Sequence, residues 1–300
     1  MSSEAREGPY RPQPGPGERL RAYLELTKPR LAFLLVAVSA ATFFIAAPRA
    51  PRWGMLAAAA ALTALLAFGI FALNHYAERE TDGLMHRTRG RPLPSRRLSP
   101  RQALLFGACL TAAAVGGIGL LFGIVAGAVA LFTFLSYIFV YTPLKRYTMH
   151  HTILGAISGA MPPLLGWACA RASLDLDAWV LFGVLFFWQF PHFLGIELMY
   201  RDDYERGGIR VITARHVSTA AVVVEMVLAM ALLAGVSILP YFTGLAGRAY
   251  LVGAAVLAAA FFAVTASAAA RRDQRSGRNL LRASVMYLPL LFLALVLNAR

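Results

Sequence analysis

Residues Trp53–Leu73 read WGMLAAAAALTALLAFGIFAL, and residues Asn74–Pro94, which follow directly, read NHYAERETDGLMHRTRGRPLP. The first part contains no charged residue and is long enough to cross a bilayer as a helix. Acidic and basic residues then appear together where the chain leaves the apolar run. Charge at the edge of a membrane helix is costly unless it has a partner or a function. The stretch therefore predicts a membrane-spanning helix followed by a polar segment that has a role of its own.

The polar segment carries three oxygen-bearing side chains at helical spacing. If the helix continues, Asn74, Glu78 and Asp82 share one face, spread over about 12 Å of helix axis. Mg²⁺ prefers oxygen ligands and is typically held by one or two carboxylates together with substrate phosphates. Planar guanidinium groups match phosphate oxygens, and the next arginines are Arg87, Arg89 and Arg91. The pattern favours a diphosphate site, but a positive-inside loop with solvated acids at the helix end would explain this stretch alone.

The composition excludes a water-soluble globule. Of 300 residues, 58% are hydrophobic and only 15% are charged, too few to cover a soluble surface. The net charge is +14, but the basic residues lie between the apolar segments and form no arm or recognition helix. We therefore expect no nucleic-acid partner. Cys109 and Cys169 each lie in an apolar run without metal-ligand spacing, which indicates packing residues.

Nine segments are apolar and long enough to span a membrane, and they are residues 31–47, 53–77, 102–122, 124–141, 152–170, 178–200, 217–239, 249–270 and 280–298. Of the 29 lysines and arginines, 24 fall on the side that begins with the N-terminus. The positive-inside rule then predicts that the N-terminus and the four larger loops face the cytoplasm. We predict an all-α integral membrane protein with about nine transmembrane helices around a central cavity that opens to the cytoplasmic side.

The chain shows no soluble module. Residues 1–22 are rich in Pro and Gly and contain Glu4, Glu7 and Glu18, but they lack the apolar core of a signal peptide. We predict a disordered cytoplasmic tail over 1–22 and a single membrane domain over 23–300.

Further polar features are predicted on the same side. In the stretch 141–146 (YTPLKR), Pro143 ends a helix, and Lys145 and Arg146 are either phosphate contacts or interfacial anchors. The stretch 188–208 reads WQFPHFLGIELMYRDDYERGG. It places Pro191, which should kink or break the helix, beside His192, which is either a functional residue or a satisfied core histidine.

The same stretch ends in a second acidic cluster. Glu197 either has a function or pairs with Arg201 at i,i+4, and Asp202 and Asp203 follow directly. Two acidic clusters separated by four spans but on one membrane face favour a shared Mg²⁺ site over two solvated helix ends.

These residues carry a resemblance to a known family. The matching stretches include YLELTKPR (23–30), RTRGRPLP (87–94), PPLLGW (162–167) and WQFPHF (188–193). With Asn74, Asp82 and Tyr287, they run from residue 23 to the last helix. The chain resembles the protohaem IX farnesyltransferases (haem O synthases), a branch of the UbiA-type intramembrane prenyltransferases. That family usually has Asp where Glu78 stands, and because Glu78 keeps the charge we expect metal binding to be retained.

The resemblance implies an Mg²⁺-dependent transfer of the farnesyl group of farnesyl diphosphate to a vinyl group of haem B, with addition of water. The products are haem O and diphosphate, for haem-copper oxidase biogenesis. It implies a bacterial inner membrane location and partners such as haem A synthase or oxidase assembly factors. His192 would ligate haem iron or orient the water. The implied metal residues are Glu78, Asp82, Asp202 and Asp203, with Asn74 beside them, and the implied diphosphate residues are Arg87, Arg91, Lys145, Arg146 and Arg201.

Other functions are compatible with parts of the pattern. A sister prenyltransferase acting on a quinone or chlorophyll precursor differs only in the haem-branch motifs. A polytopic transporter would have polar residues at mid-bilayer and on both faces, whereas here they gather on one side. A haem-binding assembly factor without catalysis needs histidines but not two acidic clusters with arginines.

Overall fold

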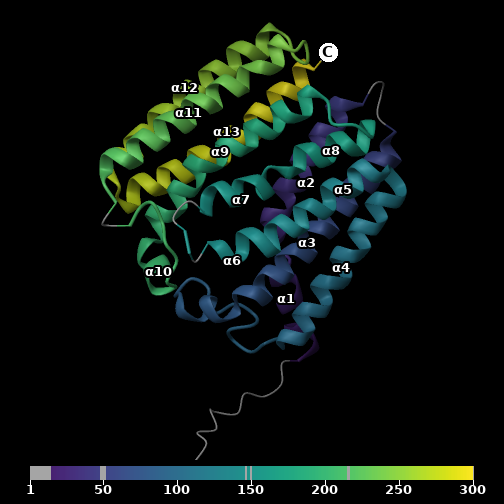
Figure 1. Ribbon diagram of the computed structural model, residues 1–300, viewed down its shortest axis with the longest axis vertical. Coiled ribbons are helices and arrows are strands. Elements are labelled where there is room, and N and C mark those ends of the chain that lie inside the picture. Colours follow the sequence, from purple (N-terminus) through teal and green to yellow (C-terminus); the bar gives the residue numbers. More distant parts are fainter. Residues whose placement is uncertain (1–14, 48–51, 146, 149–150, 215–216, 300) are drawn as a thin grey trace, which may run out of the picture.

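A computed structural model describes residues 15–47, 52–145, 147–148, 151–214 and 217–299 (Figure 1). Within these ranges the chain is helical and forms no named strand. The elements are α1 (Pro16–Leu26), α2 (Pro29–Ala46), α3 (Trp53–Leu84), α4 (Pro100–Phe122), α5 (Ile124–Leu135), the π-helix η1 (Ser136–Tyr141), α6 (Thr142–Leu144), α7 (His151–Gly159), α8 (Met161–Arg171), α9 (Leu176–Met199), α10 (Arg201–Arg206), α11 (Thr219–Phe242), α12 (Arg248–Arg271) and α13 (Gln274–Asn298).

The described residues contain nine segments long and apolar enough to cross a membrane, which confirms the predicted number and fold class. Two of them combine short elements, since α5, η1 and α6 form one span and α7 and α8 form another. Two helices extend beyond the predicted membrane segments. α3 continues to Leu84 rather than ending near residue 77, and α13 begins at Gln274 rather than at 280. Hydropathy locates the apolar part of a helix, but a helix that packs against protein continues into polar sequence.

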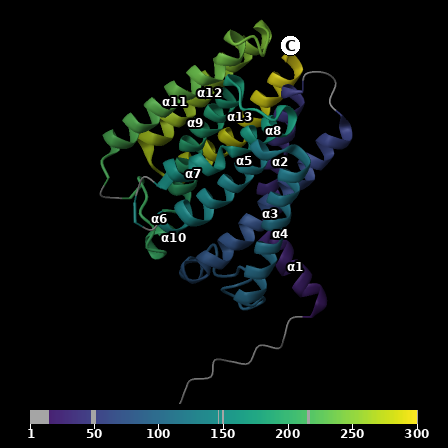
Figure 2. The same cartoon turned by 45° about the vertical axis from the view of Figure 1, so that its right-hand side comes forward.

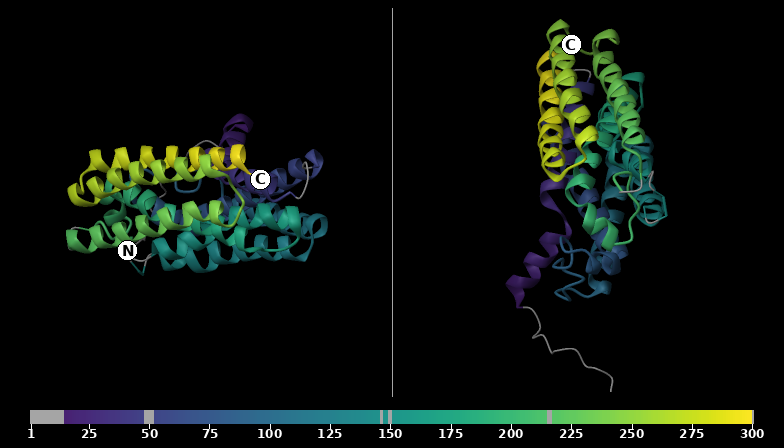
Figure 3. Two further views of the ribbon diagram at one scale, coloured as in Figure 1. Left: turned by 90° about the horizontal axis from the view of Figure 1, so that it is seen from above. Right: turned by 90° about the vertical axis from the view of Figure 1, so that its left-hand side faces the viewer.

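The long helices form a ring in which chain neighbours pack together. α2 packs on α3, α3 on α4 and α4 on α5, while α9, α11, α12 and α13 form the other half, and α13 contacts α2 to close the ring. The second half lies at the upper left of Figure 1 and stays together after rotation (Figure 2). The views in Figure 3 show α1, in purple, projecting away from this bundle.

α9 is a central helix and continues through Pro191 without a break, contrary to the stronger form of the prediction. It packs closely on α13 because Gly195 has no side chain. A Cβ at Gly195 would lie 3.0 Å from the Leu281 nitrogen and 3.1 Å from the Gly277 carbonyl oxygen. Small residues allow membrane helices to approach in this way.

One end of the bundle carries α1, the segment 85–99 and α10 (Figures 1 and 2). Residues 16–22, predicted as part of a disordered tail, are helical within α1, and residues 1–14 lie outside the described residues. The helix forms because its apolar face has a partner, since Ala22 and Leu26 pack with Leu93 and Leu98. Arg97 also donates to Glu25 at 2.7 Å, which ties the segment 85–99 to α1.

Candidate active site

Three buried polar side chains lie near the end of α3 that is predicted to face the cytoplasm. The helix continues through residue 84, so Asn74, Glu78 and Asp82 lie one turn apart on a common face. Their exposures are 2%, 8% and 0%. The Asn74 amide nitrogen donates to Glu78 Oε1 at 2.5 Å. Two carboxylates buried this deeply require compensating charge.

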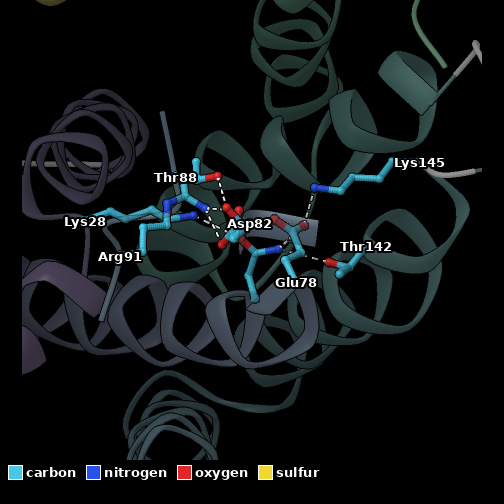
Figure 4. A network of polar contacts seen from close by, with 8 residues as sticks. Lys28, Glu78, Asp82, Thr88, Arg91, Thr142 and Lys145 are labelled. Carbon is cyan, nitrogen blue, oxygen red and sulfur yellow. Dashed lines mark hydrogen bonds and ion pairs between the residues drawn. The ribbon is translucent and has the colours of Figure 1, made fainter. Parts of the chain in front are cut away.

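Three cations supply that charge from different parts of the chain. Arg91 Nη1 donates to both oxygens of Asp82, at 2.8 and 2.7 Å. Lys145 forms an ion pair with Glu78. Lys28 Nζ donates to Asn74 Oδ1 at 3.0 Å. Figure 4 shows the acids between Lys28 and Arg91 on one side and Lys145 on the other.

A compact turn after α3 places Arg91. Thr88, which is 1% exposed, donates its hydroxyl hydrogen to the Asp82 carbonyl oxygen at 2.8 Å, and the Arg91 nitrogen donates to the Thr88 carbonyl oxygen at 2.9 Å. The chain thus turns back so that the guanidinium group of Arg91 meets the carboxylate nine residues earlier.

The π-helix η1 places Lys145. A π-turn adds a residue to a helix and is frequent at functional sites. Thr142, directly after η1, donates to the Tyr137 carbonyl oxygen at 2.8 Å and accepts from the Asn74 amide at 3.4 Å. The span ends at Leu144, three residues beyond the predicted bound of 141 and one residue after Pro143, and Lys145 follows at the Glu78 carboxylate.

The second acidic cluster meets the first through the backbone. Asp203 accepts hydrogen bonds from the backbone nitrogens of His86 (3.1 Å) and Arg87 (3.2 Å), and from Arg206 (2.5 Å). Burial alone would raise the pKa of Asp203, but these hydrogen bonds outweigh it and hold the pKa below its ordinary value. Met85 packs with Ile209 beside this contact. The two clusters, far apart in sequence, are therefore held together, with Asp203 supporting the turn that carries Arg87.

The remaining predicted residues are placed less centrally. Asp202 is exposed. The Arg87 guanidinium lies over the Tyr200 ring, 4.6 Å from its centroid. Arg201 donates to the Arg272 carbonyl oxygen at 3.1 Å, and Glu197 lies 3.9 Å from His151 Nε2 rather than on Arg201. Arg146 lies outside the described residues. The roles assigned to all of these stay predictions.

Lys28 is the site residue that sequence reasoning missed as a functional group. It lies directly before Pro29 in a left-handed conformation, φ 45° and ψ 59°, which directs the chain from α1 into α2. Burial, followed by the nearby charge of Arg91, lowers the pKa of Lys28 from 10.5 to about 7, although Glu78 and Asp82 oppose the shift. The only signal in the sequence was its place in the LTKPR stretch.

An apolar pocket of about 60 Å³ lies next to these charges, one turn of α3 farther into the membrane than Asn74. Phe71, Ile70, Leu66 and Thr63 line one wall. Lys28 Nζ lies 5.3 Å from the centroid of the Phe71 ring, so the cation is at the mouth of the pocket. A second pocket, of about 270 Å³, lies beside Glu78 and Lys145.

The donor set suits a hard divalent cation. Among the described residues no group of three His, Cys, Asp or Glu side chains is close enough to form a complete metal site. Mg²⁺ does not need one, since it commonly uses one or two carboxylates, waters and substrate phosphates. Glu78 and Asp82, with the amide oxygen of Asn74, provide oxygen ligands of that kind on one helix face.

The model of the UbiA prenyltransferase family matches residues 34–296. The chain belongs to this family. UbiA prenyltransferases similar to it include the protoheme IX farnesyltransferase of Solibacter usitatus, 40% identical over 288 residues that cover 93% of this chain and 99% of that protein. The enzyme of the same name from Sorangium cellulosum is 43% identical and covers 79% and 85%. That of Anaeromyxobacter dehalogenans is 37% identical and covers 96% and 97%.

Solved UbiA structures share the fold. The structure of digeranylgeranylglyceryl phosphate synthase superposes with a TM-score of 0.78 at 15% identity, covering 94% of this chain and 98% of that one. A UbiA homologue from Archaeoglobus fulgidus, bound to DMAPP and Mg²⁺, superposes with a TM-score of 0.68 at 15% identity, covering 91% and 98%. At this identity the agreement concerns the helical architecture alone.

Proposed function

We propose that this UbiA prenyltransferase transfers the farnesyl group of farnesyl diphosphate to a vinyl group of haem B, with addition of water, to give haem O and diphosphate. The observation that carries the proposal is the pair of buried carboxylates, Glu78 and Asp82, held among three cations at the mouth of an apolar pocket. The protoheme IX farnesyltransferases to which the chain is similar at 37–43% identity over most of its length supply the substrate pair.

The charged groups act on the leaving group. Breaking the allylic C–O bond leaves both bonding electrons on diphosphate, so the transition state gains negative charge on the diphosphate oxygens. Arg91, Lys145 and Lys28 converge where that charge would develop, and Arg87 lies on the adjoining turn. Glu78 and Asp82, with Asn74, would hold Mg²⁺, which when bound would neutralise phosphate charge and orient the leaving group. Asp202 and Asp203 complete the proposed metal-binding acids.

The apolar pocket would take the part of the donor's hydrocarbon chain next to the diphosphate, because about 60 Å³ is too small for the whole farnesyl group. Its wall descends along α3 from Phe71 to Thr63, so a prenyl tail would point into the membrane while its diphosphate stays among the cations. A dry pocket also keeps water from quenching the allylic cation before the acceptor reacts.

The coupling step balances in atoms and charge. The first carbon of the farnesyl group bonds to the terminal vinyl carbon of haem B, which moves the positive charge to the vinyl carbon attached to the porphyrin. A water oxygen bonds to that carbon and releases one proton to the surrounding water, giving the hydroxyalkyl side chain of haem O. His192 is proposed to act at the haem, and Arg146 and Arg201 as further cations at the diphosphate end.

The proposal places the protein in a bacterial inner membrane, with its N-terminus and charged site in the cytoplasm. The orientation is supported by the distribution of Lys and Arg, 24 of 29 on one side, and the bacterial inner membrane by the resemblance to the protohaem IX farnesyltransferases. Haem A synthase or oxidase assembly factors are the proposed partners, because haem O is too apolar to pass efficiently through water.

The decisive experiment gives membranes containing the protein haem B, isotope-labelled farnesyl diphosphate and Mg²⁺, and determines the mass of the porphyrin product. We expect labelled haem O, and no product when the divalent cation is chelated. Parallel reactions with a quinone precursor test the sister activity. Labelled product from the quinone precursor, with none from haem B, would refute the proposed acceptor.

A further inference from the structure

His192 is a histidine at membrane depth whose ring is held in one orientation. Its Nδ1 lies 2.8 Å from Ser284 Oγ on α13, and the Trp188 ring stacks on it with 4.6 Å between centroids. Ser284 donates its hydroxyl hydrogen to the Leu281 carbonyl oxygen at 2.8 Å. A hydroxyl has only one hydrogen, so Ser284 must accept a hydrogen bond from His192 Nδ1–H. The ring proton is therefore on Nδ1, and Nε2 carries a lone pair.

That lone pair has no partner in the part of the chain that the structure describes. His192 lies seven residues before Met199, the end of α9, which corresponds to about 10 Å of helix axis inside the membrane. An ionisable side chain within a membrane-spanning helix is a candidate functional residue. The side chain is half-buried, so Nε2 remains reachable.

The hydrogen bonds of Trp188 and Gln189, which neighbour His192 on α9, show in which direction the His192 side chain projects. Trp188 donates its indole N–H to the Ser284 carbonyl oxygen on α13 at 2.9 Å, whereas Gln189 donates to the Ala156 carbonyl oxygen on α7 at 3.1 Å. With about 100° per residue, His192 projects between these two directions, about 40° from Trp188 and about 60° from Gln189. His192 thus faces the interior between α13 and α7.

Gly183 and Gly159 show what lies on the outer and inner sides of α9. α11 packs on the opposite side of α9, where a Cβ at Gly183 would lie 3.5 Å from Val236. On the inner side, the Gln189 side chain fills the space in front of Gly159, and Gly159 lines the apolar pocket proposed for the prenyl tail. His192 is therefore one helical turn from a residue that packs on the wall of the donor pocket.

The other histidines in the described ranges do not share this arrangement. His75 and His151 are buried at 2% and 4% exposure, and His151 lies beside Glu197. His86 is exposed on the turn after α3. Only His192 among these four combines an anchored Nδ1–H with an accessible, unpaired Nε2 at membrane depth.

We propose that His192 Nε2 binds the iron of the haem substrate, and that Ser284 is a positioning residue that fixes the required tautomer. This inference rests on the proposed function, because it assigns how the acceptor of that reaction is held. Metal-ligating histidines are typically neutral and donate their other ring N–H to a fixed acceptor. Imidazole is a common axial ligand of haem iron, and an apolar porphyrin can reach a site at this depth from the lipid.

The test titrates ferric haem B into the purified full-length protein, without prenyl diphosphate or Mg²⁺, and records the absorption and electron paramagnetic resonance spectra. We expect a histidine-ligated spectrum for the wild type and its loss in His192→Gly. Added imidazole should restore the spectrum in His192→Gly, which a folding defect would not allow. Ser284→Ala should keep the ligation but weaken haem affinity by about 10–100-fold. His86→Ala is the matched control and should bind haem as the wild type does.

Wild-type affinity and spectrum in His192→Gly would overturn the proposal, and so would a wild-type spectrum without axial histidine. Because no farnesyl donor is present, the outcome is independent of catalysis. A protein that binds haem through His192 but forms no farnesylated porphyrin would refute the proposed function and leave this inference standing.

Discussion

Asp82→Asn removes one negative charge from the centre of the site with almost no change in side-chain size. Asp82 is completely buried, and both of its oxygens accept hydrogen bonds from Arg91 Nη1. The amide can neither neutralise that guanidinium nor bind Mg²⁺ as an anion. We expect the variant to remain in the membrane and to lose haem O formation.

The size of the effect follows from the contacts that are lost. Removing one partner of a buried ion pair typically costs about 3–5 kcal/mol, and because the Arg91 side chain is 23% exposed we expect stability to fall by about 3 kcal/mol. Losing one preorganised group that stabilises transition-state charge reduces kcat by about 10²–10³. Misplacement of Arg91 adds to this, so product formation should fall by about 10³ or more.

Activity is measured in isolated membranes with haem B and labelled farnesyl diphosphate at several Mg²⁺ concentrations, normalised to the amount of protein, with thermal unfolding recorded in parallel. Glu80→Gln is the matched control, because it makes the same acid-to-amide change on the same helix at a side chain that is 79% exposed. It should leave both quantities nearly unchanged. Near-normal turnover of Asp82→Asn would show that this carboxylate is not a catalytic metal ligand.

Three further outcomes are expected. Arg91→Ala should raise KM for farnesyl diphosphate more than it lowers kcat in initial-rate measurements, because its guanidinium is proposed to contact the donor both before and during reaction; an unchanged KM would contradict this. Lys28→Met should flatten the pH dependence of donor affinity, which in the wild type should be highest below pH 7 and should decline as the pH rises above 7, as followed by calorimetry. Asp203→Asn should destabilise the turn after α3 by about 1–3 kcal/mol and speed its proteolysis, with exposed Glu205→Gln on the same helix as the stability control; equal cleavage rates would contradict this.

The membrane helices and the first half of the site were predictable because both depend on local patterns. An apolar run without charge predicts a span wherever it occurs, and the i,i+4 spacing of Asn74, Glu78 and Asp82 needs only a continuous helix. The abrupt onset of charge after Leu73 is also a local pattern, and it indicated a polar segment with a role of its own. The helix ends were less predictable from hydropathy, because α1 is stabilised by packing and the first turn of α13 by the Asp273 side chain, which accepts a hydrogen bond from the Ser276 nitrogen.

The partners of these side chains were not predictable, because they come from distant positions without a periodic relation. Lys28 is 46 residues from Asn74, and Thr142 is 68 residues from it. Asp203 contacts a backbone nitrogen 117 residues away, and Ser284 lies 92 residues from His192. The charge of the loops predicted that the charged groups share one membrane side, but only the packing of the helices decides which residues touch.

Burial is the main cause of the low pKa of Lys28, and the balance of charge at the site adds to it. Without ligands, Lys28, Arg91 and Lys145 bring three positive charges to two carboxylates, and an excess charge in a partly dry site is unfavourable. A pKa of about 7 allows Lys28 to lose its proton near neutral pH, which removes the excess. An Mg²⁺–diphosphate pair carries a net negative charge, so its binding should raise the pKa of Lys28 and restore the proton. Donor binding would then take up a proton above pH 7, and it would place the third cation at the leaving group only when the donor is present.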